Sequence, residues 1–250
     1  MISVVIPTLD AEQRLAACLT ALVPAMIEGI VREVVIVDGG STDRTLKIAD
    51  QAGCDVVIAE RGRGSQLIAG ANRSRQPWLL FLHADSVLSP GWELEAADFI
   101  ARVDTGQRPR QAAVFRFALD DVGMAPRLLE KSVALRGLLF GLPFGDQGLL
   151  ISRNLYREIG GYSAVPLMED VGIVRRLGRR RLARLRATSI TGARRYREEG
   201  YVKRIARNQL CLLLYALGVS PRRLAEIYRG SAGAEPGLAA DGEAERIKSI

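Results

Sequence analysis

Short β-rich runs alternate with helix-length segments over the first ninety residues, and this alternation constrains the fold more than any other feature of the sequence. The runs are Ile2–Ile6, Val34–Val37, Val56–Ile58 and Leu79–Leu82. The stretches between them are long enough for crossover helices, which is typical of a parallel sheet covered on both faces. We therefore expect an α/β fold with a mainly parallel central sheet flanked by helices.

Polar or turn residues follow three of these four runs. The run ends are Pro7-Thr8-Leu9-Asp10, Asp38-Gly39-Gly40-Ser41 and His83-Ala84-Asp85. The carboxyl ends of parallel strands lie at the same edge of a sheet, and ligands bind there in open α/β sheets. The sequence therefore predicts one edge of the sheet as the functional site.

The remaining pattern predicts one domain over residues 1–229, with a nucleotide-binding half at about 1–105 and an acceptor and catalytic half at about 106–229. A chain of 250 residues with 48% hydrophobic composition can bury a sizeable core. Residues 230–250 are rich in glycine, alanine and acids and predict a mobile tail. Further strands are expected at Ala113–Leu119, Gly148–Ser152 and near Leu182–Leu185, and helices at Arg44–Ala52 (capped by Ser41 or Asp43), Gly91–Val103, Arg127–Leu139, Met168–Leu177 and Tyr201–Leu217.

The positive charge of the chain is regional. The net charge is +7, and twelve arginines fall between Arg175 and Arg207. Clustered positive charge attracts anionic ligands, anionic membranes or nucleic acid, although such a stretch is most often a solvated face. Arginine forks suit diphosphate, so Arg194 and Arg195 are candidate acceptor or diphosphate contacts, together with Asp146 and Gln147. The helix at 201–217 is either a packed core helix or an interfacial helix on a membrane.

The cysteines and the N-terminal residues indicate the cellular compartment of the protein. Cys18, Cys54 and Cys211 are far apart and lack CxxC spacing, which argues against a disulfide framework and a thiolate zinc site. No secretion signal precedes the first strand, and no apolar stretch reaches the roughly 18 uncharged residues of a spanning helix. We expect a cytoplasmic protein, with peripheral attachment at the inner face of the cell membrane as an extension of that expectation.

Two of the motifs have both a functional and a purely structural interpretation. Alternation along an extended strand would place His83 and Asp85 on one side, where they could hold Mg²⁺ or Mn²⁺ together with diphosphate oxygens. The alternative is a loop with a solvated aspartate and a hydrogen-bonded histidine. Glu169 and Asp170 are either a general base at the mouth of a site or acidic residues favoured at a helix start.

The loop at residues 38–43 is either a ligand-contacting loop or an ordinary tight turn. The loop at residues 7–10 has neither a GxGxxG pattern nor a P-loop lysine. This argues against NAD-type and P-loop phosphate sites.

Taken in order, these motifs resemble the inverting family-two glycosyltransferases of the GT-A fold. Residues 5–12 resemble the opening "IPTxNE" signature, residues 37–43 resemble "VDGGSTD", and residues 83–85 resemble the DxD motif. The similarity covers about residues 2–175. With the segment Gly62-Arg63-Gly64-Ser65-Gln66 and the HAD form of the third motif, the sequence is most similar to a bacterial subgroup associated with radical-SAM and selenium-related gene neighbourhoods.

The resemblance implies a GT-A nucleotide-diphospho-sugar transferase fold and an enzyme of the hexosyltransferase class. Such an enzyme moves one sugar, with inversion, from a UDP- or GDP-sugar to a small or lipid-linked hydroxyl acceptor. Asp170 corresponds to the catalytic base with Glu169 beside it, and Asp85 to the ligand of a divalent cation, Mg²⁺ or Mn²⁺, with His83 as a second ligand. The implied nucleotide-sugar contacts are Pro7, Thr8, Asp10, Glu12, Asp38, Gly39, Arg63, Gln66 and Ala84.

The sequence also departs from the family pattern. His83 replaces the first carboxylate of DxD, and Asp10 replaces an asparagine. No QxxRW motif follows the base, which favours single transfers over processive synthesis. Two other functions stay open: a sugar-1-phosphate nucleotidyltransferase, and a non-catalytic basic protein on the same fold that binds a membrane or nucleic acid. No specific nucleic-acid partner is expected.

Overall fold

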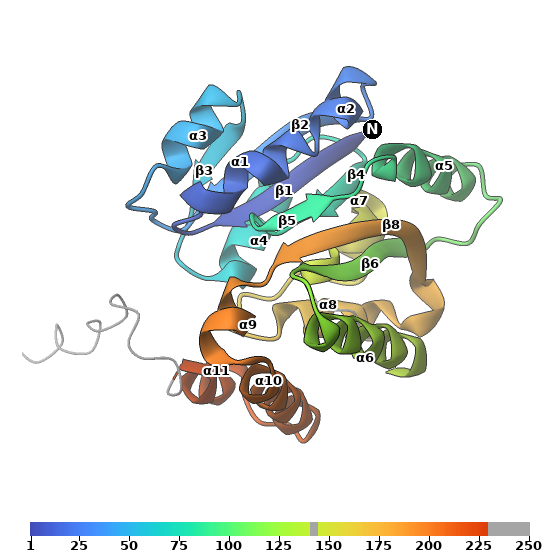
Figure 1. Ribbon diagram of the computed structural model, residues 1–250. Coiled ribbons are helices and arrows are strands. Elements are labelled where there is room, and N and C mark those ends of the chain that lie inside the picture. The colour runs from blue at the N-terminus through green and yellow to red at the C-terminus, as the bar shows by residue number, and fades with distance from the viewer. Residues whose placement is uncertain (141–144, 230–250) are drawn as a thin grey trace, which may run out of the picture.

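A computed structural model of the chain describes residues 1–140 and 145–229 (Figure 1). Eight strands form one sheet in the order β3-β2-β1-β4-β7-β6-β8-β5. The strands are β1 Ile2–Thr8, β2 Val31–Asp38, β3 Asp55–Ile58, β4 Trp78–Phe81, β5 Ser86–Leu88, β6 Ala112–Asp120, β7 Leu149–Ser152 and β8 Leu182–Gly192.

Helices cover both faces of this sheet. They are α1 Glu12–Thr20, α2 Val23–Ile27, α3 Thr45–Gln51, α4 Arg63–Arg73, α5 Trp92–Asp104, α6 Met124–Phe140, α7 Arg153–Glu158, α8 Glu169–Leu177, α9 Arg194–Glu199, α10 Tyr201–Ala216 and α11 Pro221–Arg229, with short 3₁₀ turns η1 Gly145–Gln147 and η2 Arg179–Arg181. The helices expected from the sequence pattern are present, with small shifts at their ends.

The predicted α/β fold with a mainly parallel sheet is confirmed. Strands β1, β2, β3 and β4 are parallel, and β6 is parallel to β8. Strand β7 runs antiparallel between β4 and β6. Thr8 lies opposite Asp38 in the β1–β2 register, so the ends of these two strands meet at one edge.

The core has one layer on each face of the sheet. Val4 and Ile6 belong to the layer that packs against α1 and α5, whereas Val5 belongs to the layer under α4 and α8. Both faces are buried, which explains the near-continuous apolar runs. Helix α4 packs closely on β1, since a Cβ added at Gly70 would lie 2.2 Å from Val5 Cγ1.

The chain around the third motif differs from the expectation. Strand β4 ends at Phe81, and Ala84 and Asp85 form a turn in which the Ser86 amide donates to the His83 carbonyl at 3.1 Å. The expected alternation of His83 and Asp85 along an extended strand is therefore wrong. The turn sends the chain across to pair β5 antiparallel with β8.

Strand β8 is also longer than its apolar core predicted. The expectation covered residues 182–185, but the strand continues to Gly192 through residues with polar side chains. Pairing with β6 on one side and β5 on the other supplies backbone partners along this polar part. Tertiary pairing thus extends a strand that the local sequence signals weakly.

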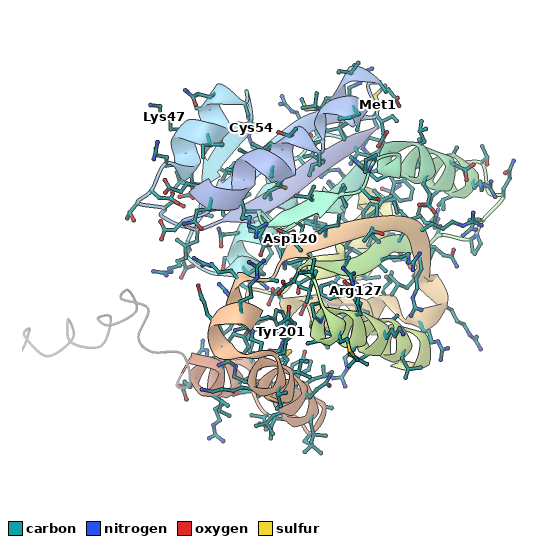
Figure 2. All side chains as sticks on the ribbon, viewed as in Figure 1. Met1, Lys47, Cys54, Asp120, Arg127 and Tyr201 are labelled. Atoms are coloured by element: carbon teal, nitrogen blue, oxygen red, sulfur yellow. The ribbon has the colours of Figure 1, made fainter. Side chains whose placement is uncertain are left out.

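Helices α6, α10 and α11 lie together below the sheet (Figure 1). The labelled residues Asp120, Arg127 and Tyr201 lie where the end of β6 meets α6 and α10 (Figure 2). Tyr201 Oη donates to Asp121 Oδ2 at 2.6 Å, and Arg127 Nη2 donates to the Asp121 carbonyl at 3.2 Å. The segment after β6 is therefore fixed to both helices.

Within residues 1–140 and 145–229, no helix has both the length and the apolar character that a bilayer-crossing segment needs. The predicted mobile tail at 230–250 lies outside the described residues.

Candidate active site

Side-chain hydrogen bonds join the loops that follow β1 and β2. The Thr42 amide donates to Asp10 Oδ1 at 2.8 Å, and the Glu12 amide donates to Asp43 Oδ2 at 3.0 Å. The Ala11 amide donates to Thr45 Oγ1 at 2.7 Å. Asp43 Oδ1 also accepts from the Thr45 amide at 2.9 Å, so Asp43 rather than Ser41 serves the start of α3. The two loops form one connected unit at the predicted edge.

Asp38 lies under this unit with no exposed surface. Its Oδ2 accepts from the amides of Gly40 and Ser41 at 2.9 and 2.8 Å, and its Oδ1 accepts from the hydroxyls of Thr8 and Ser41. Burial raises the pKa of Asp38, but these hydrogen bonds outweigh it and leave the pKa below its ordinary value. Each oxygen accepts two hydrogen bonds, so Asp38 organises the loop.

Gln66 plays a similar supporting part. Its side-chain amide donates to the carbonyls of Thr8 and Val37 at 2.8 and 2.7 Å. A Cβ at Gly39 would lie 3.2 Å from that amide nitrogen, so the absence of a side chain at Gly39 lets Gln66 reach both strand ends. Of the expected nucleotide contacts, Thr8, Asp38, Gly39 and Gln66 are buried, whereas Pro7, Asp10, Glu12, Arg63 and Ala84 have exposed surface.

Arg63 lies at the centre of a group of acids. Gly64 permits a close approach that brings it there, because a Cβ at Gly64 would lie 2.3 Å from the Ser163 carbonyl oxygen. Arg63 Nη1 is 3.6 Å from Glu169 Oε1. Burial alone would lower the pKa of Arg63, but four carboxylates raise it above its ordinary value: Glu169, Asp146, Asp170 and Asp85. The charges of acids from three sequence motifs therefore act on one guanidinium group, and we call Arg63 and these four acids the Arg63 cluster.

Glu169 and Asp170 begin α8 in different environments. Glu169 is 2% exposed, and its Oε1 accepts no hydrogen bond within the described part of the chain, although Arg63 Nη1 lies 3.6 Å away. Burial raises the pKa of Glu169, with Arg63 opposing and Asp170 adding to the shift. Asp170 is half-buried, and its Oδ1 accepts from the Val171 amide at 2.7 Å. Met168, just before them, has φ +67°, a conformation that costs a residue with a side chain about 1–2 kcal/mol.

His83 contacts a carboxylate from another motif. Its Nδ1 lies 2.9 Å from Asp146 Oδ1, and Ser189 Oγ donates to the Asp146 carbonyl at 2.8 Å. Burial opposes the charge on Asp146, but the hydrogen bond from His83 and the charges of His83, Arg63 and Arg195 lower its pKa to about 2. Among the expected acceptor or diphosphate contacts, the charge of Arg195 thus acts on Asp146.

Arg194 is directed elsewhere. Its Nε lies 3.8 Å from Glu198 Oε1 on the same helix. Arg194 therefore differs from Arg195 in the acid with which it interacts, although the two residues are adjacent in sequence and both are exposed.

The donor set suits a divalent cation that is shared with a ligand. Within the described ranges, no group of three or more His, Cys, Asp or Glu side chains is arranged to hold a metal ion. Asp85 offers carboxylate oxygens, and Nε2 of His83 is left once Nδ1 is engaged by Asp146. Mg²⁺ is usually bound by one or two carboxylates plus substrate phosphates, so these residues fit such an ion without a complete protein cage.

A cavity lies beside this cluster, between the sheet and α8. His83, Tyr162, Glu169 and Asp170 provide its polar lining. Tyr162 packs edge-on against Phe81 at 4.9 Å, and burial, with the charges of Asp170 and Glu169, raises its pKa. Sequence reasoning missed Tyr162. The glycine pair Gly160-Gly161 just before it indicates a turn in the sequence, and both glycines have positive φ in the structure.

Comparison with known proteins agrees with this geometry. Residues 3–114 match the model of glycosyl transferase family 2. This part of the chain is therefore similar to glycosyl transferase family 2. A PGL/p-HBAD biosynthesis glycosyltransferase of Mycobacterium tuberculosis is 32% identical over 174 residues, which cover 65% of this chain and 63% of the relative. The chain therefore spans less than two thirds of that relative's length.

A second relative and a solved structure point the same way. Glucosyl-3-phosphoglycerate synthase of Mycolicibacterium paratuberculosis is 33% identical over 95 residues, covering 34% of this chain and 29% of the relative. The M. tuberculosis glucosyl-3-phosphoglycerate synthase, solved with Mn²⁺, UDP and phosphoglyceric acid, has a TM-score of 0.56 at 20% identity and covers 88% of this chain and 79% of its own. These structures confirm the expected GT-A fold.

Proposed function

We propose that this protein is an inverting glycosyltransferase that moves a single sugar from a UDP- or GDP-sugar to a hydroxyl acceptor. The observation that carries the proposal is a cavity lined by His83, Glu169 and Asp170, in which Glu169 lies 3.6 Å from Arg63 and His83 lies 2.9 Å from Asp146. The family match of residues 3–114 supports it. The UDP and UDP-glucose complexes of the structural neighbours also support it.

Two further points belong to the proposal. Residues 1–229 form a single domain. The chain belongs to the bacterial subgroup named above, which the HAD motif and the segment Gly62–Gln66 support.

The exposed part of the loops would bind the donor. Pro7, Asp10, Glu12 and Ala84 offer surface to the nucleoside, while the buried Thr8, Asp38, Gly39 and Gln66 hold those loops in place. Arg63 would bind the diphosphate, since a guanidinium group can donate two parallel hydrogen bonds to phosphate oxygens.

Asp170 is the proposed base. Its carboxylate would take the proton of the acceptor hydroxyl as that oxygen bonds to the anomeric carbon and the bond to the diphosphate breaks. The negative charge that leaves with the diphosphate would be offset by Arg63. Glu169, with its raised pKa, stays against Arg63 and positions it.

A divalent cation is proposed as the cofactor. The structural neighbours were solved with Mn²⁺ or Mg²⁺ and UDP. Asp85 would hold the ion, with His83 as a second ligand through Nε2. When bound, the ion supplies further positive charge to the leaving diphosphate.

Peripheral attachment to the inner face of the membrane is part of the proposal. Exposed apolar side chains lie on α6 (Met124, Leu128, Leu135) and α10 (Val202, Leu210, Leu213). Exposed apolar surface with neighbouring basic residues such as Lys131 and Lys203 suits an anionic bilayer. Co-sedimentation with anionic vesicles tests this point, and binding no stronger than to neutral vesicles would remove it.

The two other functions find less support. The loop at 7–10 lacks the glycine-rich basic segment of nucleotidyltransferases. Several of the clustered arginines are engaged locally: Arg181 pairs with Glu158 at 2.6 Å, and Arg175 lies 5.2 Å from the Tyr215 ring centroid. Such engagement weakens the interpretation as a basic nucleic-acid-binding protein.

The test is a thermal-shift panel of nucleotides and sugar nucleotides, with and without Mn²⁺, followed by assay of nucleoside diphosphate release. The proposal predicts stabilisation by UDP or GDP that Mn²⁺ strengthens, and release of the same diphosphate from its sugar donor. No stabilisation by any nucleotide would overturn it.

A further inference from the structure

A second cavity lies between the end of β6, α6, η1 and α10. Its apolar wall consists of Phe117, Leu129, Val133 and Ile205. The two cavities are linked by the His83–Asp146 pair, because His83 lines the cavity beside α8 and Asp146 lines this one. A molecule in the second cavity would therefore reach the cluster around Arg63 at Asp146.

Gln147 gives this cavity an unsatisfied polar group. The side chain is 8% exposed, and its Nε2 donates to the Phe115 carbonyl at 3.0 Å. That bond fixes the orientation of the amide, because the reversed amide would place two oxygens together. Gln147 Oε1 is left buried without a hydrogen-bond donor among residues 1–140 and 145–229. Buried amide oxygens are nearly always paired, so this atom points to a ligand that donates an O–H or N–H.

The charge in the wall limits the class of ligand further. Asp146 lines the cavity and is paired with His83 at 2.9 Å, and its carboxylate, which only accepts hydrogen bonds, offers an anionic molecule no donor. The polar lining consists of Asp146, Tyr196 and the amides of Gln147, Asn208 and Gln209, and the four apolar side chains form the rest of the wall. A neutral ligand with an apolar body fits both features.

We propose that this cavity binds the acceptor, that the acceptor is a neutral alcohol with an apolar body, and that Gln147 Oε1 receives one of its hydrogen-bond donors. The inference rests on the proposed glycosyl transfer and names its substrate class. The apolar body lies against Leu129, Val133 and Ile205, and the reacting hydroxyl points past Asp146 towards Asp170. Gln147 is then a specificity-determining residue.

The test uses the full chain saturated with UDP or GDP and Mn²⁺, with binding followed by calorimetry. The probes are 1,2-octanediol, its 1-methyl ether, glycerol and phosphoglyceric acid. The diol should bind, the ether should bind about five- to tenfold more weakly because it lacks one donor, and glycerol and phosphoglyceric acid should not compete.

Variants place the binding in the cavity. Gln147→Met should weaken the diol about five- to tenfold and leave the ether unchanged. Gln111→Met is the matched control, since Gln111 Nε2 also donates to a main-chain carbonyl, that of Arg180 at 3.0 Å. Val133→Trp should fill the cavity and remove diol binding, and Ile205→Trp does so from α10 if the first variant does not fold.

Equal binding of glycerol and diol would overturn the inference, as would an unchanged diol affinity in Gln147→Met or displacement of the diol by phosphoglyceric acid. Nucleotide binding separates this failure from that of the proposed function. If UDP or GDP binds and the diol does not, only the acceptor inference falls. If no nucleotide binds, the proposed transfer itself falls.

Discussion

The loops after β1 and β2 and the cluster around Arg63 satisfy their polar groups in opposite ways. In the loops, Asp38 alone accepts four hydrogen bonds and Gln66 donates two. At the cluster and beside it, Glu169 Oε1 and Gln147 Oε1 are buried and accept no hydrogen bond from the residues that the structure describes. In the proposed function, the loops after β1 and β2, which we call the cradle, are completed by the protein itself, whereas the cluster is completed by the substrates.

The largest effect is expected at the proposed base. Asp170→Asn should lower sugar transfer by about 10²–10⁴-fold, because the acceptor hydroxyl loses the group that takes its proton. Nucleotide affinity should stay unchanged, since the cradle is a separate region. Diphosphate release and nucleotide titration measure the two, with the exposed helix acid Asp98 (Asp98→Asn) as control. Transfer near the wild-type rate would remove Asp170 as the base.

The next effect concerns the cation. Asp85→Asn should weaken nucleotide binding in the presence of Mn²⁺ by roughly 10–100-fold, because the chain loses its carboxylate ligand. Chelation by EDTA should bring the wild type to the level of the variant and leave the variant unaffected. If EDTA has no effect on the wild type, the cation has no part in donor binding.

The third effect is a loss of stability when a hydrogen-bonding residue of the loops after β1 and β2 is replaced. Asp38→Asn should lower the free energy of unfolding by about 2 kcal/mol, because an amide nitrogen would face N–H and O–H donors at one of the two positions. The native pKa of Asp38 is lowered, so the stabilisation exists above its unfolded pKa and is lost as pH falls through the native one. Urea titrations should show the full difference in free energy of unfolding between the wild type and Asp38→Asn at pH 7, and a smaller difference below about pH 4. A pH-independent difference would contradict this account.

The smallest effect is expected at Met168. Met168→Gly should raise the free energy of unfolding by about 0.5 kcal/mol, because glycine relieves the positive φ but adds freedom to the unfolded chain. Gly substitution at Leu167, which is not at positive φ, should instead destabilise. Destabilisation of similar size at both positions would mean that Met168 is not strained.

The cradle could be predicted from the sequence because its residues are local to strand ends. Thr8 and Asp38 close neighbouring parallel strands, and a parallel sheet brings such ends together without further information. The sequence did not indicate that the side chains of Asp38 and Gln66 would form hydrogen bonds with other groups of the protein. Their environment depends on the glycine at position 39 and on the exact approach of α4.

The cluster was predictable only in part. The motifs around Asp85 and Asp170 were visible, but the close contact at Gly64 that brings Arg63 to Glu169 is tertiary. The pairing of His83 with Asp146 likewise depends on the turn after β4 and on β8, whose polar half carries no strand signal of its own. Long-range pairing therefore decided the parts that local pattern missed.

Helix α4 carries both Arg63 of the cluster and Gln66, which donates to the strand ends, so substitution of Arg63 tests the central claim most directly. UDP and GDP would be titrated into the wild type and Arg63→Met in the presence of Mn²⁺. The account predicts that one nucleotide binds and that the variant binds it at least about tenfold more weakly, the loss expected for one charge-assisted contact. Equal affinity of the two proteins, or no binding to either, would contradict the assignment of this edge as a nucleotide-sugar site.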